Sequence, residues 1–439
     1  MKPRQPHRRQ LISAKSPTEL INTEPQISET STTVSLLQRI PHHAKAFCRP
    51  ILVVAAHVIL VVAVLPILYL LEPFRPVRIT HFATERMGHL SGDIHLFRAR
   101  RFIAGKKDRF FRIFLGGYPC NQALLNIWKR YLPINDNPWL STFWHYCKNT
   151  LARTRFDLPE TQTTNIHFEY AKFADYPEFT AEEEEQGREL LDKIGIGPTD
   201  WFVTFHVRDS AYGRYRFPHL EVQESPRNGN INDYLMAANA IVNMGGFAIR
   251  VGDVTQDPLG CRTTDKIVDY SHDFRSEFGD VYLAAKCRFF LGGPSGLPQL
   301  STIFGVPVAM ASMVPVTPHP VGPDALFAPV RICDRGTGRV LHYREAHELG
   351  MFDNREGYQW RDTQYDEEGF DVLQSSPEDI RDLALDMIDQ TNDVRPSDDT
   401  ARLQNIYRHE YANCGAGYEY APTIAPRFAM KYRHLIEAQ

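Results

Sequence analysis

The chain has 439 residues, of which 43% are hydrophobic and 23% charged, and it carries a formal net charge of −4. That length predicts more than one domain, and the composition is typical of a globular protein and excludes wholesale disorder. The seven cysteines are scattered and form no Cys-x-x-Cys pair, which excludes a disulfide scaffold and a cysteine-based zinc site. So small a net charge does not indicate nucleic-acid binding, and no nucleic-acid partner is expected.

The N-terminal part of the chain divides into a polar segment and an apolar one. Residues 1–45 are rich in Ser, Thr, Gln and Pro, so we predict a disordered basic tail. Residues 46–72 contain a run from Ile51 to Leu71, 21 residues without Asp, Glu, Lys or Arg. A helix of that length spans roughly 31 Å, the thickness of a bilayer core, which predicts a membrane-associated helix. The alternatives are two buried strands broken near Pro66 and a helix that only dips into one leaflet.

After residue 72, short β-like runs alternate with amphipathic helical runs, the pattern of α/β domains with parallel sheets. Glycines at 195 and 197 end a helix, and we predict a domain boundary there. The first domain is expected over 73–198 and the second over 199–375. A helical segment over 376–439 is expected to follow them. The expected strands are 77–83, 112–116, 201–206, 247–251, 266–268, 288–291 and 306–309. The expected helices are 92–102, 121–131, 232–244, 277–285 and 296–304, with two more beginning after Thr180 and Ser376. Residues 313–329 and 365–369 are expected to be loops.

The first motif with chemical potential lies where a predicted strand ends. It contains His206, Arg208, Asp209 and Tyr212. Ligands of open α/β sheets bind at the carboxyl ends of strands, and the Arg208 guanidinium can neutralise a diphosphate through paired hydrogen bonds. The alternative interpretation is an Arg–Asp ion pair that closes a loop.

The second motif is a strand, a turn of small residues and a helix start. Gly292, Gly293 and Gly296 would let a ligand approach the backbone, and the Ser295 hydroxyl could donate to a phosphate oxygen. The amides near Gly296 and Leu297 would form the positive end of a helix. The turn matches neither the dinucleotide nor the P-loop pattern. A glycine turn that serves only tight packing is the alternative.

The third motif, residues 84–89, follows the first strand of the first domain. Its Arg86 and His89 are expected to face the cleft between the two domains, and His89 could act as a general base near neutral pH. A structural histidine is the alternative. The sequence has no Asp-x-Asp, no His-Glu-x-x-His and no Gly-x-Ser-x-Gly motif, so neither a metal-dependent mechanism nor serine-hydrolase chemistry is expected.

These motifs resemble those of a bacterial family of glycosyltransferases encoded among surface-polysaccharide genes, over roughly residues 73 to 435. The resemblance consists of six segments: Arg86–His89, His206–Tyr212, Asn228–Tyr234, Gly246–Gly252, Ile267–Tyr270 and Cys287–Gly296. The His-x-Arg strand end with a later Ser-Gly helix start is also similar to the donor domain of GT-B fucosyltransferases. That resemblance implies two Rossmann-like domains facing a cleft, with the acceptor side in the first domain and the nucleotide sugar in the second.

The resemblance further implies a GDP-sugar donor held by the motif arginine, without a metal. Arg208, Ser295 and the amides at Gly296 and Leu297 would then stabilise the departing diphosphate, with His206 close to them. One type of fucosyltransferase has a second arginine where this chain has aspartate after Arg208, and Gly293-Pro294 also departs from the family pattern. Both departures bear on the identity of the donor sugar.

The remaining roles follow from the same interpretation. Tyr212 and Asp280 would contact the base or the sugar, and His89 or Asp209 would deprotonate the acceptor hydroxyl. The acceptor would be a glycan or a lipid-linked glycan. The resemblance implies the bacterial inner membrane. Because the chain has no Asn-x-Ser/Thr sequon, we expect the catalytic part in the cytoplasm, and a single pass that places it outside is the alternative. The alternatives are a catalytically inactive GT-B-like membrane protein of an envelope-assembly complex and a transferase of another phosphate-activated group.

Overall fold

The computed structural model describes residues 42–105, 109–159, 166–216, 225–254, 258–260, 264–313, 322, 324–351, 364–411 and 423–437. Its contacts divide the chain into two compact units, Met1–Val58 and Ile59–Gln439. The predicted tail lies outside the described residues up to position 41. The two domains predicted over 73–198 and 199–375 therefore fall within a single compact unit, and the boundary between them stays a prediction.

The apolar segment is helical throughout. It consists of α1 (His42–Ile59), the π-helical turn η3 (Leu60–Val64) and α2 (Leu65–Leu71). Pro66 stands in the first turn of α2, directly after the π-turn, where the helix tolerates a residue without an amide hydrogen. Residues Pro50–Leu71 have a mean hydropathy of 3.0 and by length and composition could cross a membrane. The helical conformation rules out the alternative of two buried strands.

The part of the chain after this helix forms a small parallel sheet in the order β1-β2-β3. The expected strands 77–83 and 112–116 are confirmed, and the expected helix at 92–102 is longer because its first turn already begins at Met87. The elements are β1 (Val77–Phe82), α3 (Met87–Ala104), β2 (Phe111–Gly116), α4 (Gln122–Lys129), β3 (Ile134–Asn135), α5 (Pro138–Leu151) and α6 (Ile166–Ala171).

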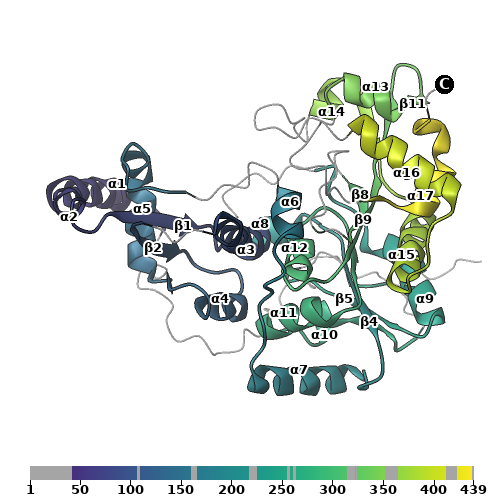
Figure 1. The fold of residues 1–439 in the computed structure, drawn as a ribbon, viewed down its shortest axis with the longest axis horizontal. Helices are drawn as coiled ribbons and strands as arrows, with labels where there is room; N and C mark the ends of the chain where they lie inside the picture. The colour runs from purple at the N-terminus through teal and green to yellow at the C-terminus, as the bar shows by residue number, and fades with distance from the viewer. Residues whose placement is uncertain are drawn as a thin grey trace, which may run out of the picture. The chain divides into compact units, whose positions relative to one another are not determined.

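The second sheet has seven parallel strands in the order β13-β9-β8-β7-β4-β5-β6. Four of them, β4, β5, β8 and β9, are labelled in Figure 1. Both sheets confirm the predicted α/β class with parallel sheets. The strands are β4 (Phe202–His206), β5 (Phe247–Arg250), β6 (Ile267–Asp269), β7 (Phe290–Gly292), β8 (Val308–Met313), β9 (Leu326–Pro329) and β13 (Thr423–Ile424). The helices among them are α7 (Ala181–Ile194), α8 (Ala211–Arg216), η4 (Ile231–Tyr234), α9 (Leu235–Asn243), α10 (Tyr270–Asp273), α11 (Glu277–Lys286) and α12 (Leu297–Thr302).

Two of the expected helix starts are confirmed by their capping side chains. Thr180 and Glu183 form a capping box at α7, and Ser376 accepts a hydrogen bond from the Asp379 amide at the next long helix. The apolar stripe of that helix is buried in the main core, as the periodicity predicts. This C-terminal region comprises α13 (Tyr343–Glu348), α14 (Gln364–Glu367), α15 (Pro377–Thr391), α16 (Asp398–Tyr411), α17 (Pro426–Lys431) and η7 (Arg433–Leu435).

Part of the region expected to be loop is instead a strand. β9 runs over residues expected to be loop because its short apolar run is fully buried between β8 and β13. Likewise α14 covers most of the loop expected at 365–369. A third, antiparallel sheet in the order β11-β10-β12 was not predicted. Its strands are β10 (Arg331–Asp334), β11 (Arg339–Val340) and β12 (Phe370–Leu373).

The first sheet and the second sheet are joined by a shared hydrophobic core. Leu90 of α3 and Leu124 of α4 belong to the same buried cluster as Val281 of α11, Leu300 of α12 and Ile303 directly after α12. The helix pairs α3–α12 and α4–α11 are in contact. The loop after β1 is thereby held against the turn after β7, which brings two of the predicted motifs together.

Candidate functional site

The strand order of the large sheet points to one place for a ligand. From β4 the chain proceeds to β5 and β6 on one side, and then crosses to β7 on the other side of β4. The switch in direction therefore lies between β4 and β7. In open parallel sheets the loops diverge at such a point and leave a crevice outside the carboxyl ends of the strands, where ligands bind.

Two of the predicted motifs meet at this switch point. His206, the last residue of β4, is in register with Gly292 of β7, and the Gly293 amide donates to the His206 carbonyl over 3.2 Å. A Cβ atom on Gly292 would lie 2.4 Å from that carbonyl oxygen, so the close approach of the strand ends requires glycine. The segment with Arg208 and the segment with Ser295 thus leave neighbouring strands at one edge of the sheet.

His206 is held in a fixed orientation. Its Nδ1 lies 3.0 Å from the Val251 carbonyl oxygen, and burial lowers its pKa to about 4. The imidazole is therefore neutral near pH 7, with the proton on Nδ1 donated to the carbonyl. The other ring nitrogen, Nε2, remains as a hydrogen-bond acceptor.

The residues after β4 shape the entrance to the next helix. The Asp209 Oδ1 accepts a hydrogen bond from the Ala211 amide over 2.8 Å, so this carboxylate occupies the turn that starts α8. Arg208 is half-buried, and its carbonyl accepts from the Gly229 amide over 3.0 Å. Tyr212 lies in α8, and its side chain is outside the described residues.

The turn after β7 presents one hydroxyl and a tightly packed glycine. Ser295 Oγ is buried and has no hydrogen-bond partner within the described part of the chain, which is unusual for a buried polar atom. A Cβ atom on Gly296 would lie 2.6 Å from the amide nitrogen of Gly88 in the first turn of α3. The start of α12 at Leu297 is therefore backed by α3, and Pro298 removes one amide donor from its first turn.

The same contact brings the third motif to the site. His89, in the first turn of α3, lies with its Nδ1 3.1 Å from Oδ2 of Asp93, one turn later. This hydrogen bond raises the pKa of His89, while its partial burial opposes the rise. A carboxylate on Nδ1 fixes the tautomer that leaves Nε2 to take a proton. The sequence prediction missed Asp93, although its spacing of four residues from His89 in a helix would have indicated the pair.

Asp280 is buried and belongs to an ionic group that the sequence did not indicate. Its Oδ2 is 3.1 Å from Nη2 of Arg275, whose Nη1 is 2.9 Å from Oδ1 of Asp253. Burial raises the pKa of Asp280 and Arg275 opposes the rise. The second carboxylate oxygen of Asp280 is buried and has no hydrogen-bond partner among the residues that the structure describes.

A small pocket adjoins the switch point on the side of β8. The backbone of Ser312, at the end of β8, has a φ of 52°, a left-handed conformation that is rare outside glycine. Two hydrogen bonds hold this conformation. The Ser312 amide donates to the Ser375 hydroxyl over 3.0 Å, and the Ser375 amide donates to the Ser312 hydroxyl over 2.9 Å. The pocket is lined by Val207, Arg227, Gly229, Asn230, Asp233, Tyr234, Gly293, Pro294, Ser312, Gln374, Ser375 and Ile380.

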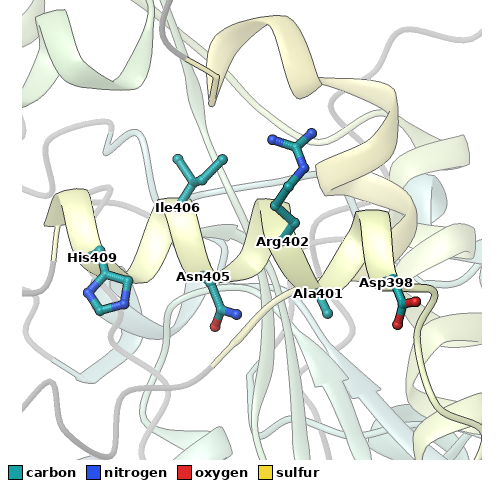
Figure 2. Close-up of a pocket in the computed structure, with 6 residues that line it drawn as sticks. All are labelled: Asp398, Ala401, Arg402, Asn405, Ile406 and His409. Carbon is teal, nitrogen blue, oxygen red and sulfur yellow. The ribbon is translucent and has the colours of Figure 1, made fainter.

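A second hollow lies on α16 and contains none of the predicted site residues. Its lining comes from this one helix: Asp398, Ala401, Arg402, Asn405, Ile406 and His409. Figure 2 shows Arg402 and Ile406 pointing to one side of α16 and Asn405 and His409 to the other. A surface made by a single helix does not enclose a ligand, so we place the candidate site at the switch point.

Within the described ranges, no three His, Cys, Asp or Glu side chains are grouped closely enough to hold a metal ion. The groups available at the switch point are hydrogen-bond donors and acceptors, an arginine and two histidines. Such a set can bind a phosphate-bearing ligand and accept a proton.

No protein-family model and no curated protein matches the chain. Among solved structures, the chain is similar to the ADP-heptose lipopolysaccharide heptosyltransferase II of E. coli, with 8% identity over 72% of this chain and 100% of that one, at a TM-score of 0.43. It is similar to a family 9 glycosyl transferase of Veillonella parvula, with 10% identity over 71% and 97% of the two chains and a TM-score of 0.41. The E. coli heptosyltransferase WaaC, solved with ADP-2-deoxy-2-fluoro heptose, has 9% identity over 57% and 93% and a TM-score of 0.30.

Proposed function

We propose that this protein is a glycosyltransferase that moves a sugar from a nucleoside-diphosphate donor to a glycan or lipid-linked acceptor in bacterial surface-polysaccharide synthesis. The observation that carries the proposal is the meeting of Arg208 and the Ser295 turn at the topological switch point. Each of these groups suits a diphosphate, and the sheet topology supports a ligand at the place where both lie. The motif resemblance to glycosyltransferases gives the reaction class.

In this proposal the donor binds along the carboxyl edge of the large sheet. Arg208 pairs with the diphosphate and stabilises the charge that develops when the bond from the sugar to the diphosphate breaks. The unpartnered Ser295 hydroxyl donates to a phosphate oxygen, with the amides at Gly296 and Leu297 beside it. The unpartnered oxygen of Asp280 accepts a hydrogen bond from an N–H group of the base. No metal ion takes part.

The acceptor is activated from the side of α3. His89 takes the proton from the acceptor hydroxyl on Nε2, while Asp93 holds the Nδ1 proton and stabilises the imidazolium that forms. Asp209 is the weaker candidate for the base, because its carboxylate already caps α8. We further propose a location at the bacterial inner membrane with the catalytic part in the cytoplasm, where nucleotide sugars are made.

The decisive experiment is a thermal-shift screen of the purified full chain with GDP, UDP, ADP and CMP. One nucleotide at about a hundred times its Kd should stabilise the fold by about 2.7 kcal/mol, which raises Tm by a few °C. The variant Arg208→Ala should lose this shift. The control Arg188→Ala should keep it, because Arg188 lies on the surface of α7 and pairs with Glu185.

A turnover assay with the sugar derivative of the stabilising nucleotide completes the test. Arg208→Ala should lower kcat by about a hundredfold or more, as expected for one lost charge-stabilising donor. Full turnover in this variant would refute the assignment. Failure of all four nucleotides to shift Tm would favour the inactive envelope-assembly protein, and transfer of a group other than a sugar would favour the second alternative.

A further inference from the structure

Large apolar side chains around the small sheet are exposed among the residues that the structure describes. Phe74 precedes β1 and is 84% exposed, Phe102 at the end of α3 is 65% exposed, and Phe111 at the start of β2 is 47% exposed. Three exposed phenylalanines are costly for a surface that faces only water. They come from three segments that are separate in the sequence.

The parallel topology brings these three segments to one edge. Val77 and Phe111 are partners in the register of β1 and β2, so both strands begin at the same edge. The chain segment before β1 contains Phe74, and the segment after α3 leads into β2. We call this amino edge, defined by Phe74, Arg75, Phe102, Arg109 and Phe111, the aromatic edge.

The aromatic edge carries positive charge among its rings. The guanidinium carbon of Arg75 lies 4.5 Å from the centre of the Phe111 ring, and both Arg75 and Arg109 are exposed. One neighbouring acid, Glu72, is already engaged by a bidentate pair with Arg78, with distances of 2.8 and 2.9 Å. The combination of exposed aromatic rings and arginines matches the interface of a bilayer that contains anionic lipids.

The apolar helix fixes where this edge must lie if the helix enters a membrane. Leu68 of α2 packs with Val77 of β1 and with Phe156 in one buried cluster. Its neighbours on the same turns, Ile67 and Leu70, are 56% and 72% exposed. The helix α2 therefore presents one apolar side to the body and another apolar side outward. Only five residues separate Leu71, the end of α2, from Val77, the start of β1, so the edge of the sheet lies close to the end of the apolar helix.

We propose that the aromatic edge lies on the surface of an anionic bilayer, so that the body is docked to the membrane rather than held away from it on a stalk. The arginines contact lipid phosphates and the phenylalanines enter the interface beside α2. The carboxyl edge, with the loop after β1, then lies about 20 Å from the bilayer, since β1 has six residues. This inference does not depend on the proposed function.

The test replaces single aromatic residues of the full chain by the photoreactive analogue p-benzoylphenylalanine, which keeps the aromatic ring and adds a benzoyl group that the exposed positions can accommodate. The positions are Phe74, Phe102 and Phe111, with Tyr118 as the matched control because it is 50% exposed and follows the opposite end of β2. Val62 of the apolar helix, 71% exposed, reports whether that helix is inserted. The probes are vesicles of equal parts phosphatidylethanolamine and phosphatidylglycerol, and vesicles of phosphatidylcholine alone.

The proposal predicts lipid adducts at all three phenylalanine positions, at about ten times the yield at Tyr118 in the anionic vesicles. The double variant Arg75→Gln/Arg109→Gln should reduce the yield at Phe102 in those vesicles to the value in phosphatidylcholine. Lipid adducts at Val62 combined with yields at Phe102 and Phe111 no higher than at Tyr118 would overturn the proposal. So would the absence of lipid adducts at every position, or protein adducts in place of lipid adducts when the same variants are irradiated in cells.

Discussion

The contact between Gly88 and Gly296 allows a prediction whose size can be worked out from the structure. A Cβ atom on Gly296 would lie 2.6 Å from the Gly88 amide nitrogen, and ordinary van der Waals contact begins at 3.4 Å. The two helices α3 and α12 must therefore separate by about 0.8 Å, because the obstructing atom belongs to the backbone and cannot rotate away. Leu90 and Leu300 in the shared core would lose contact as a result.

Gly296→Ala should destabilise the fold by about 1 to 3 kcal/mol, the usual cost of overpacking a filled interior. For a body of this size that corresponds to a fall in Tm of about 1 to 4 °C. Urea unfolding of the full chain, followed by circular dichroism, measures the free energy, and differential scanning calorimetry measures Tm. Gly88→Ala should cost less, because its Cβ would lie 3.1 Å from the Gly296 Cα.

Gly293→Ala is the matched control for this experiment. It lies in the same turn, but its Cβ would be 3.6 Å from both the Tyr234 hydroxyl and Val207 Cγ2, which is ordinary contact. We expect its stability to be within about 0.5 kcal/mol of the parent chain. Equal stability of Gly296→Ala and Gly293→Ala would refute the close approach of α3 and α12, and with it the meeting of the two motifs.

Three further predictions test individual side chains. Asp93→Asn should lower turnover at least about tenfold and move the acidic limb of the pH profile of turnover to lower pH. The reason is that the hydrogen bond between His89 and Asp93 raises the pKa of the histidine. An unchanged pH profile would contradict this role of the hydrogen bond. Burial lowers the pKa of His206 to about 4, below the 6.5 of an unfolded histidine, so the free energy of unfolding should fall as the pH drops from 6.5 towards 4. Urea titrations should show that His206→Gln removes about 3 kcal/mol of that fall. An equal pH dependence in the two proteins would show that burial does not lower the pKa of His206. Burial raises the pKa of the Cys287 thiol to about 11. Under native conditions a maleimide should therefore modify the partly exposed Cys333 at least about tenfold faster than Cys287. Comparable rates of modification of the two cysteines, measured by peptide mass spectrometry, would refute the burial of Cys287.

Much of the local structure follows from patterns that involve neighbouring residues. Buried strands such as β4 and β5 are short apolar runs with β-branched side chains, and helix starts such as Thr180 and Ser376 carry their own capping groups. The third sheet escaped prediction because β10 and β12 are half-buried, lie almost forty residues apart in the sequence and have no strong alternation. The start of α3 was placed too late because Gly88 and Gly92 weaken its apolar period.

The candidate site was also predictable from the sequence only in part. The sequence indicated His206, Arg208 and Ser295 because each follows a predicted strand at the position where α/β proteins bind ligands. It did not indicate that the two strands are neighbours, since that depends on the crossover from β6 to β7. The partners of Asp280 were also beyond the sequence, because Asp253 and Arg275 reach it from two separate loops.

The sequence by itself therefore determined the apolar N-terminal helix, the α/β class and the chemical groups that a phosphate-bearing ligand would need. These features depend on composition and on spacing along the chain, which secondary structure converts directly into faces and strand ends. Only the tertiary structure packed Gly88, the neighbour of His89, against Gly296 in the turn that carries Ser295, and only it closed the Asp253–Arg275–Asp280 group. The physical reason is that strand order and helix packing are set by the burial of apolar surface over the whole body, and no local pattern encodes which buried surfaces meet.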